Sequence, residues 1–522
     1  MEKVAVIGSG LAGLTAAHLL SKQLNVTIFE FADKTGMDVA SVSVKDINND
    51  EVRIDVPMRS INEAYYPSLF KLFKYVGMET TVGKYEVAEY HWDGPASQQN
   101  QNKSYFSFHR HFFFGFEFPW ALVTFAGTSM LLTLQFLFEF LRILLHTFYL
   151  TQTKSFNSIK GTFGDFVKEH HFSDEFVKLV LLPALATMAT STHQALLDYP
   201  ARIILHVIAP FGSTFAQAKG GMRLLCQKLL SNVKEVHYNQ EIIGAWTLKN
   251  DQVVIQTKDL KLHTFDKIVF AVQGSIAKKI LARKPPTELQ DSVKPPLSPL
   301  MDCLNTFKYE SVPVVVHTEK SLMPFDKTQW RGINCTTDGK ESMATIWVNY
   351  THRLPEGSPD FFETSCLFVN PKPVIPKEKI LNQYTFPRSY VTEQSCEALN
   401  IIEHYQGQQN IYFVGSWVWP GMPLLEGCVA SAIRVAERIG IPRGWEPEGR
   451  ECLPWTAESE DKRGLVERYL SNDLTASQPK RGTVMQLLAN IGLVYLKFQL
   501  DILTGIIGFY RSIFVQQIKK VQ

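Results

Sequence analysis

The pattern of apolar and polar residues predicts an α/β chain that begins with a strand, a turn and a helix. Residues 4–7 form a short apolar run of the kind found in buried parallel strands. From Leu11 to Leu20, leucines and alanines recur at helical spacing, and a second apolar run at 26–29 predicts the next strand. We interpret this order as one βαβ unit.

Later segments repeat the alternation of strand and helix. Residues 219–225 open a helix, 236–272 are rich in strand patterns, and 410–414 form an apolar run that ends in a glycine turn. A further helix is predicted at 429–439, and the apolar run 312–316 predicts a strand in another part of the chain.

The first turn carries glycines at the spacing of a dinucleotide site. Gly8 permits the tight turn, Gly10 lets the backbone approach a pyrophosphate, and Gly13 lets the helix pack against the strand. Glu30 ends the second strand, where a carboxylate takes ribose hydroxyls and repels a 2′-phosphate. The residues predicted to hold the dinucleotide are Gly8, Ser9, Gly10, Leu11, Ala12, Gly13 and Glu30. The alternative is a glycine-rich turn in an ordinary βαβ unit.

Three separated blocks resemble the flavin amine-oxidase and phytoene-desaturase superfamily. They are the first turn, the segment Lys219–Leu225 with its following strands, and the segment from Asn410 to Cys428. The resemblance implies FAD, bound non-covalently, with the last block along the flavin and its helix N-terminus facing the pyrimidine side of the ring. The further cofactor contacts that it implies are Ile242 at the adenine, or an ordinary core residue there, and Gly415, Ser416, Glu426 and Gly427 at the flavin.

A closer likeness, from about residue 3 to 440, is to predicted FAD-binding oxidoreductases that occur beside cyclopropane fatty-acid synthases. The matching segments are Tyr66–Leu69, Thr162–Phe166, Leu182–Pro183, Tyr199–Ala201, Phe307–Tyr309, Val316–Glu319, Leu322–Pro324 and Val369–Pro371.

The chain departs from these relatives in two places. A paired glycine and a basic or imidazole residue usually follow the acidic residue, whereas here Gly36 precedes Met37 and Asp38. In the last block Leu424 stands where the subfamily has a histidine and where amine oxidases have one ring of an aromatic sandwich, although Trp417 and Trp419 are close in sequence.

The resemblance implies an α/β fold, in which a Rossmann-like FAD-binding domain is interleaved with an α+β substrate domain and followed by a C-terminal apolar helix. The expected FAD-binding pieces are residues 1–80, 209–300 and 402–442. The expected substrate domain has a helical part at 81–208 and a sheet part at 301–401. A linker is expected at 443–483 and a membrane-associating helix at 484–522.

Candidates for chemistry beyond the cofactor are few. His317 ends the apolar strand of the expected substrate domain and is the candidate for proton transfer, with a structural histidine as the alternative. Cys428 follows the Glu-Gly pair instead of preceding it, which favours a buried free thiol over a covalent flavin link.

Charge and cysteine content exclude several other classes. Lys and Arg number 53 against 51 Asp and Glu, so nothing favours a nucleic-acid partner. The 7 cysteines are scattered singly, which predicts neither a metal site nor a disulfide framework. Because the first predicted strand begins at Val4, we expect no secretory signal. The oligomeric state has no signal in the sequence.

Two apolar segments raise the question of a membrane. Residues 112–150 are rich in aromatic residues, and Pro119–Phe138 carries no charge, so this segment is either a buried helix of the substrate domain or a membrane segment. The C-terminal helix, apolar nearly all round with basic residues toward its end, is either an anchor in an anionic cytosolic leaflet or packed on the body. We therefore expect a membrane-associated protein with a cytosol-facing catalytic domain.

Three functions follow from these observations. The first is an FAD-dependent oxidoreductase that oxidises or rearranges an apolar, lipid-like substrate by hydride transfer to flavin. The second is a membrane-associated protein with a degenerate flavin site and no turnover, which the turn at Met37 favours. The third is a true amine oxidase, which the missing aromatic ring at Leu424 disfavours.

Overall fold

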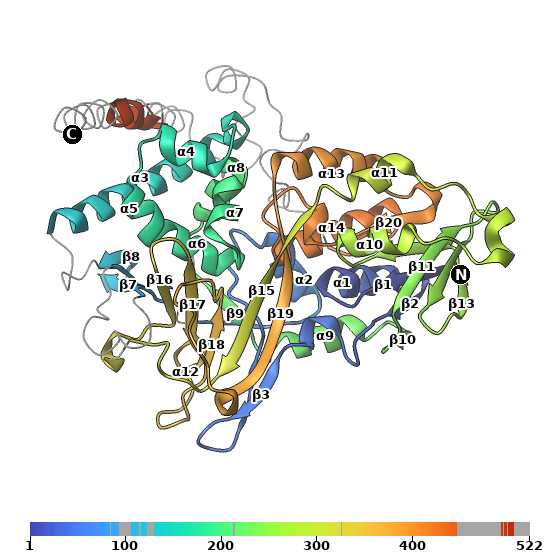
Figure 1. The fold of residues 1–522 in the computed structure, drawn as a ribbon, viewed down its shortest axis with the longest axis horizontal. Coiled ribbons are helices and arrows are strands. Elements are labelled where there is room, and N and C mark those ends of the chain that lie inside the picture. The colour runs from blue at the N-terminus through green and yellow to red at the C-terminus, as the bar shows by residue number, and fades with distance from the viewer. Residues whose placement is uncertain are drawn as a thin grey trace.

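The computed structural model describes residues 1–83, 85–92, 106–113, 116–122, 130–211, 214–324 and 326–445, and positions 492–493, 495–497 and 499–505 near the C-terminus. Within these residues a parallel sheet of five strands forms the first body (Figure 1). Its order is β10 (Glu235–His237), β2 (Asn25–Phe29), β1 (Lys3–Ile7), β14 (Lys267–Phe270) and β20 (Ile411–Phe413). Pieces of chain far apart in sequence thus contribute strands to one sheet.

Successive residues of β1 point to opposite faces of this sheet, which gives it two apolar interfaces. Val4 and Val6 belong to the cluster that packs helices on one face, whereas Ala5 and Ile7 belong to the cluster on the other face. The helices of the first face are α1 (Leu11–Leu20), α2 (Pro67–Tyr75), α9 (Gly221–Leu230) and α14 (Leu425–Arg438). The second face carries the antiparallel strands β11 (Ile242–Thr247), β12 (Val253–Thr257) and β13 (Leu262–Phe265), with helices α10 (Gly274–Leu281), α11 (Ser298–Cys303) and α13 (Glu393–Tyr405).

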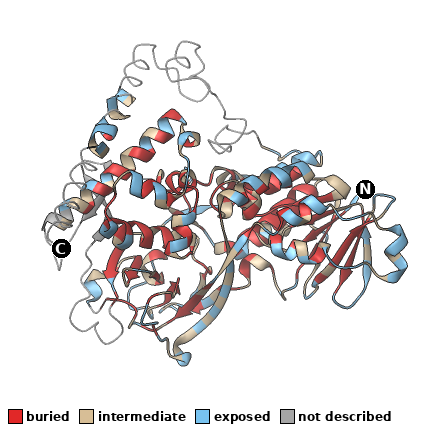
Figure 2. Ribbon diagram, turned by 45° about the horizontal axis from the view of Figure 1, so that its top comes forward, coloured by how far each residue is buried: buried red, intermediate tan, exposed pale blue. Residues whose placement is uncertain are grey.

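The second body contains a mixed sheet of eight strands and a group of helices. The strand order is β19 (Ile380–Tyr390), β15 (Lys308–His317), β18 (Phe362–Ser365), β17 (Ser342–Trp347), β16 (Ile333–Thr337), β6 (Val87–His91), β7 (Phe106–Phe113) and β8 (Phe116–Leu122). The main helices are α3 (Met130–Thr153), α4 (Phe163–Glu169), α6 (Leu182–Ala189), α7 (His193–Asp198) and α8 (Ala201–Ile208). Figure 2 shows many strands and the inner helix faces buried, and the outer faces of the helices exposed. The long strand β19 is an exception, since none of its residues is buried.

The α/β class and the Rossmann-like sheet expected from the sequence are confirmed. The segment 81–208, expected as the helical part of the substrate domain, also contributes three strands, β6, β7 and β8, to the large sheet. The uncharged run 119–138 is not one helix, since β8 ends at Leu122 and α3 begins at Met130. Aromatic residues favour strands, and an apolar run alone does not separate strand from helix.

Polar and charged side chains attach helix α3 to the rest of the second body, although most of its sequence is apolar. Glu139 is buried, and its carboxylate accepts hydrogen bonds from the backbone N–H and the hydroxyl of Ser173, both at 2.9 Å. The Arg142 guanidinium lies 3.9 Å from the centre of the Phe172 ring. Among the described residues, no helix has the length and apolarity needed to cross a membrane.

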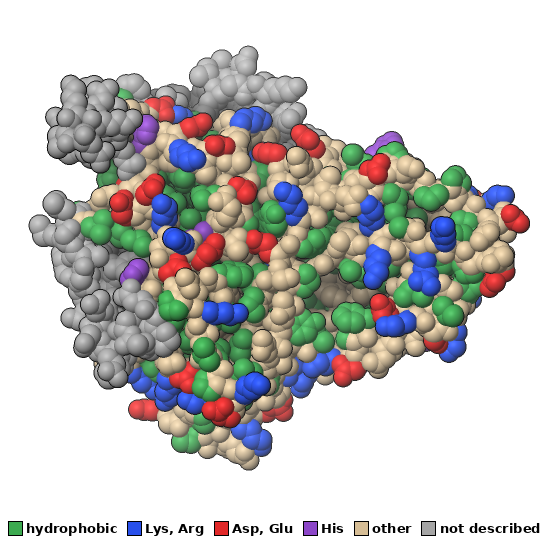
Figure 3. All heavy atoms as spheres, viewed as in Figure 1, with side chains coloured by type: hydrophobic (Ala, Val, Ile, Leu, Met, Phe, Trp, Pro, Cys, Tyr) green, Lys and Arg blue, Asp and Glu red, His purple; other side chains and the backbone are tan. Residues whose placement is uncertain are grey.

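The expected linker at 443–483 lies, beyond residue 445, outside the described residues, as does much of the expected helix at 484–522. Where the C-terminal region is described it is helical, and Lys497 pairs with Asp501 one turn later. Leu500 is 2% exposed, whereas Tyr495 is 63% exposed. This helix therefore buries one face and leaves apolar side chains on another. On the face of the molecule shown in Figure 3, acidic and basic side chains are interspersed.

Candidate functional site

The glycine turn between β1 and α1 is tight at both ends and open in the middle. Gly8 has a φ of +100°, and a Cβ there would lie 2.8 Å from the carbonyl oxygen of Ala271. A Cβ on Gly13 would lie 2.1 Å from the carbonyl oxygen of Gly8. A Cβ on Gly10 would meet no atom within 4 Å. The turn thus leaves space above Gly10, where the sequence predicts a pyrophosphate.

The first turn of α1 presents free backbone donors to this space. Gly10 is the N-cap residue and supplies no side-chain cap, so the amides of Leu11, Ala12 and Gly13 have no acceptor within the helix. The macrodipole of the helix adds positive potential at the same end. The arrangement suits a bound anion such as a diphosphate.

Glu30 lies next to this turn and is almost completely buried. Its Oε2 accepts a hydrogen bond from the Ser9 N–H at 2.8 Å and another from the Ser9 hydroxyl. Its Oε1 accepts one hydrogen bond, from the Ala32 N–H at 3.0 Å, and keeps capacity for a sugar hydroxyl. Ser9 therefore orients the carboxylate, and its hydroxyl also accepts the Gly36 N–H at 2.8 Å.

Ile242 begins β11 and belongs to the same apolar cluster as Ile7 and Phe29, which precede Gly8 and Glu30. Its backbone is thus near the sugar end of the predicted site. The adenine contact at this position stays a prediction.

The unusual turn at Met37 and Asp38 is held by charge. Asp38 is buried and pairs with Arg53 of β4 (Glu51–Ile54) and, at 3.2 Å, with Arg223 of α9. Met37 is 8% exposed. The acidic side chain is therefore neutralised from two elements, and the turn is fixed despite the lost second glycine.

The last block is assembled around the start of α14. The Gly415 N–H donates to the Ser431 hydroxyl at 3.0 Å. A Cβ on Gly427 would lie 2.8 Å from the Cβ of Trp419 and 3.2 Å from the Cα of Ser416, so the helix approaches the 415–419 turn closely. Glu426 accepts hydrogen bonds from the N–H groups of Ser68 at 2.9 Å and Leu69 at 3.2 Å. Its side chain therefore caps α2, and a flavin contact here would come from the backbone.

Three charged side chains lie near this helix start: the buried Glu363 and the half-buried Arg59 and Arg388. Arg59 and Arg388 are each coupled electrostatically to the Cys428 thiol in the first turn of α14. The Glu363 Oε1 accepts the Met58 N–H at 2.8 Å. Within the described chain, Nε of both arginines and Oε2 of Glu363 have no hydrogen-bond partner. Unpartnered buried groups of this kind indicate a missing polar partner.

Burial shifts the pKa values of these groups strongly. It raises the pKa of Glu363 to about 7, although the nearby Arg59 works against this rise. Burial, and after it the charge of Arg59, lowers the pKa of Arg388 to about 10. Two guanidiniums and a helix N-terminus thus make this end of the site rich in donors and positive charge.

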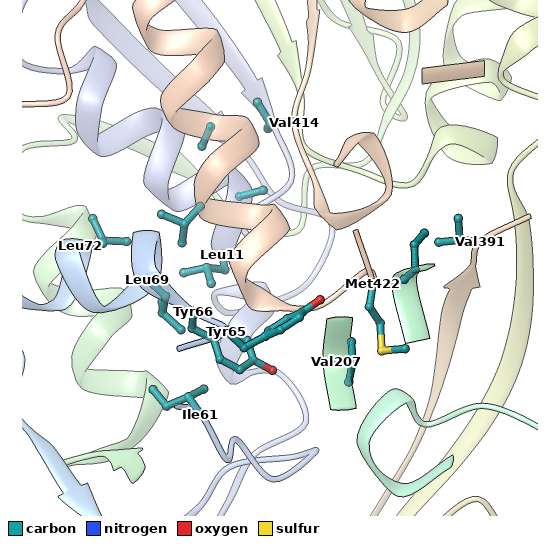
Figure 4. Packing of buried hydrophobic residues seen from close by; sticks show 14 of the residues in the cluster. Leu11, Ile61, Tyr65, Tyr66, Leu69, Leu72, Val207, Val391, Val414 and Met422 are labelled. Carbon is teal, nitrogen blue, oxygen red and sulfur yellow. The ribbon is translucent and has the colours of Figure 1, made fainter. Parts of the chain in front are cut away.

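A cavity of about 440 Å³ lies between the helices and the large sheet. Tyr65, Tyr66 and Leu424 line it on the side of α14, and both tyrosines also belong to the core of the first body. Their rings meet edge to face at 5.1 Å (Figure 4). The cavity thus adjoins the helix start at which the two arginines lie.

Three residues considered at the sequence level lie elsewhere. Trp417 packs in the core against Phe307, and Trp419 packs against α14; neither lines the cavity. His317 is 0% exposed and does not line it either. The Nδ1 of His317 accepts the Glu319 N–H at 3.1 Å, and Nε2 pairs with the Thr364 hydroxyl at 2.8 Å. Burial lowers the pKa of His317 to about 4, so it is a neutral structural histidine and not a proton-transfer residue.

Sequence reasoning missed Arg59, Glu363, Arg388 and Glu89, a further cavity residue. Glu363 and Glu89 each stand in a short strand whose immediate neighbours are buried. A carboxylate at an inward position of such a strand is a detectable signal, because charged residues are almost never fully buried without a partner.

These residues fit an FAD molecule. The open space above Gly10, the free amides of α1 and the Glu30 carboxylate match its diphosphate and ribose. The unpartnered donors of Arg59 and Arg388 match the acceptor atoms of its ring. The parallel sheet with this glycine turn defines a Rossmann-type dinucleotide-binding protein.

Comparisons with known proteins agree with this class. Residues 6–76 match the model of the NAD(P)-binding Rossmann-like domain. The fold is similar to that of a fatty acid isomerase from P. acnes, with a TM-score of 0.55 and 14% identity over 84% of this chain and 98% of that one. The fold is also similar to that of cyclohexylamine oxidase from Brevibacterium oxydans, with a TM-score of 0.54 and 11% identity over 84% of this chain and 99% of that one. No curated protein matches by sequence.

A third similar structure comes from Exiguobacterium and bears the provisional name protoporphyrinogen oxidase. Its TM-score is 0.53, with 12% identity over 84% of this chain and 98% of that one. At these identities the likeness concerns the fold.

Proposed function

We propose that this protein is an FAD-dependent oxidoreductase that acts on an apolar substrate held in the cavity. The observation that carries the proposal is the open glycine turn with free α1 amides beside Glu30, in a fold shared with several oxidoreductases. The finer likeness to oxidoreductases that occur beside cyclopropane fatty-acid synthases is part of the same proposal.

Each part of the site has a separate task. The amides of α1 bind the diphosphate and Glu30 orients the ribose. Arg59, Arg388 and the N-terminus of α14 hold the electron-rich edge of the ring and stabilise negative charge there. Bound flavin supplies the hydride acceptor. The apolar walls of the cavity orient the substrate and exclude water.

The choice of an apolar substrate rests on the lining of the cavity. Phe140, Val180, Leu181, Val207 and Phe211 contribute apolar surface to it. A true amine oxidase is less well supported, because Leu424 lines the cavity at the place of the aromatic ring and both nearby tryptophans lie outside it. The choice of a lipid is also supported by the similar fold of a fatty acid isomerase.

A substrate screen with a blocked cavity tests the proposal. We expect FAD-loaded protein, mixed anaerobically with an unsaturated fatty acid, to bleach its flavin or release an isomerised product. Ala184→Phe, which places a ring in the cavity wall, is expected to slow this reaction at least about tenfold, because misplacing a substrate by about 1 Å costs this much or more. Its FAD content is expected to stay unchanged.

Ile276→Phe, on the exposed face of α10, serves as the control and is expected to react like the wild type. Bleaching by primary amines alone would refute the lipid preference. A flavin that no substrate bleaches or turns over would favour the alternative of a flavin-binding protein without activity.

We also propose that the protein associates with an anionic cytosolic membrane surface. The support is an exposed apolar stripe on α3, where Leu134, Phe138, Leu141 and Phe148 are each at least 41% exposed. Phe140 of the same helix lines the cavity. Leu141→Glu with Phe148→Glu is expected to abolish flotation with vesicles that contain phosphatidylserine. Unchanged flotation of this double variant would contradict the proposal.

A further inference from the structure

Glu89 of β6 is a carboxyl group buried in the wall of the cavity. Its side chain is 1% exposed, and it lines the cavity together with Val87, its neighbour on the same face of the strand. Cys335 is its register partner on the parallel strand β16 and lines the cavity too. Glu89 therefore belongs to the cavity wall on the side of the sheet.

The Cys335 thiol, a weak donor, is the polar group of the described chain that acts on this carboxyl. Neither carboxyl oxygen has a partner within hydrogen-bond geometry. The Cys335 sulfur is 3.2 Å from the Thr187 hydroxyl, so the thiol beside Glu89 has another polar neighbour. A buried carboxyl without hydrogen-bond partners destabilises a fold. Its presence in the cavity wall therefore indicates a functional role.

The surroundings of Glu89 also favour its neutral form. Burial raises the pKa of Glu89 well above its ordinary value, and the Cys335 thiol lowers that pKa by less. Arg353 is the one cation among the described lining residues, and its side chain is exposed. In its neutral form the group is a carboxylic acid, which has an O–H donor and a carbonyl acceptor.

We propose that Glu89 binds an uncharged oxygen of the substrate, a hydroxyl or a carbonyl, and so positions an otherwise apolar chain in the cavity. The inference rests on the proposed function, because it takes this cavity as the substrate site. It specifies the substrate class further: a neutral oxygenated lipid in place of an alkylammonium ion. Pairing of an ammonium ion with Glu89 would need this carboxyl ionised, and its burial opposes that ionisation.

Ligand binding to FAD-loaded protein tests the role of Glu89 without relying on turnover. Calorimetric titration with 1-decanol is expected to show binding to the wild type, and Glu89→Gln is expected to bind within about threefold, because an amide also donates and accepts. Glu89→Leu is expected to bind about tenfold more weakly, the effect of one lost hydrogen bond. Glu89→Leu conserves volume and removes an unsatisfied group, so its melting temperature is expected to be no lower than that of the wild type.

Infrared difference spectroscopy gives a signature that a purely structural role would not move. Decanol is expected to shift the C=O stretch of a protonated carboxyl in the wild type, and this shifted band is expected to be missing in Glu89→Gln. Glu63→Leu, at an exposed position, is the control and is expected to bind and shift like the wild type.

Three results would overturn the proposal. They are wild-type affinity of Glu89→Leu for decanol, absence of decanol binding to the wild type, and tighter binding of decylamine with loss of the protonated-carboxyl band. In each case the FAD content is expected to stay the same. If the flavoprotein proposal itself failed, the protein would not retain FAD, so the two failures can be told apart.

Discussion

Gly10→Ala is expected to lower the affinity for FAD by on the order of 100-fold, equivalent to about 2.7 kcal/mol. In the structure a Cβ at this position meets no atom within 4 Å, so the methyl group enters the space above the α1 amides. A diphosphate held there must then move away from the backbone donors. The backbone itself accepts alanine, because Gly10 has a φ of −66°.

The measurement is a calorimetric titration of flavin-free protein with FAD, together with the melting temperature of the flavin-free form. Replacing glycine by alanine at an N-cap costs at most about 1 kcal/mol, so the fold is expected to persist. Gly505→Ala, in the described C-terminal helix, is the matched control and is expected to bind FAD like the wild type. Unchanged affinity of Gly10→Ala would place the cofactor elsewhere.

Gly13→Ala is expected to destabilise the fold itself, by roughly 3 kcal/mol of unfolding free energy or more. Its Cβ would lie 2.1 Å from the Gly8 carbonyl oxygen and 2.9 Å from the Cβ of Ala271. The first of these atoms is backbone, so relief requires α1 to move away from the sheet. α1 packs against α14 and α9, which makes this movement costly.

Chemical denaturation of flavin-free Gly13→Ala, compared with Gly10→Ala, measures this effect. The same substitution three residues apart is expected to act on stability at Gly13 and on FAD affinity at Gly10. Equal stability of the two variants would show that the turn does not pack as described.

The parts of the fold that depend on local patterns could be predicted from the sequence. The apolar run at 4–7, the glycines after it and the helix to Leu20 specify β1, the turn and α1, because each is determined by neighbouring residues. The prediction for the aromatic segment after residue 105 was wrong, because β8 pairs with β7 and β7 pairs with β6. An apolar run alone does not reveal this pairing.

Some residues of the candidate site could likewise be predicted from local sequence, whereas others could not. Ser9 and Glu30 followed from their place beside a strand end and meet as hydrogen-bond partners. Arg59, Glu363 and Arg388 come from three distant segments, and only the packed structure shows that they share one buried region. His317 misled because a histidine at a strand end has the same sequence signal whether it faces a cavity or, as here, a neighbouring threonine.

The most direct test of the account is the identity of the nucleotide that the protein carries. Purified full-length protein, denatured by heat and analysed by mass spectrometry, is expected to release FAD at close to one molecule per chain, and the emptied protein is expected to rebind it. Protein that releases no flavin and stays colourless after incubation with excess FAD would contradict the account.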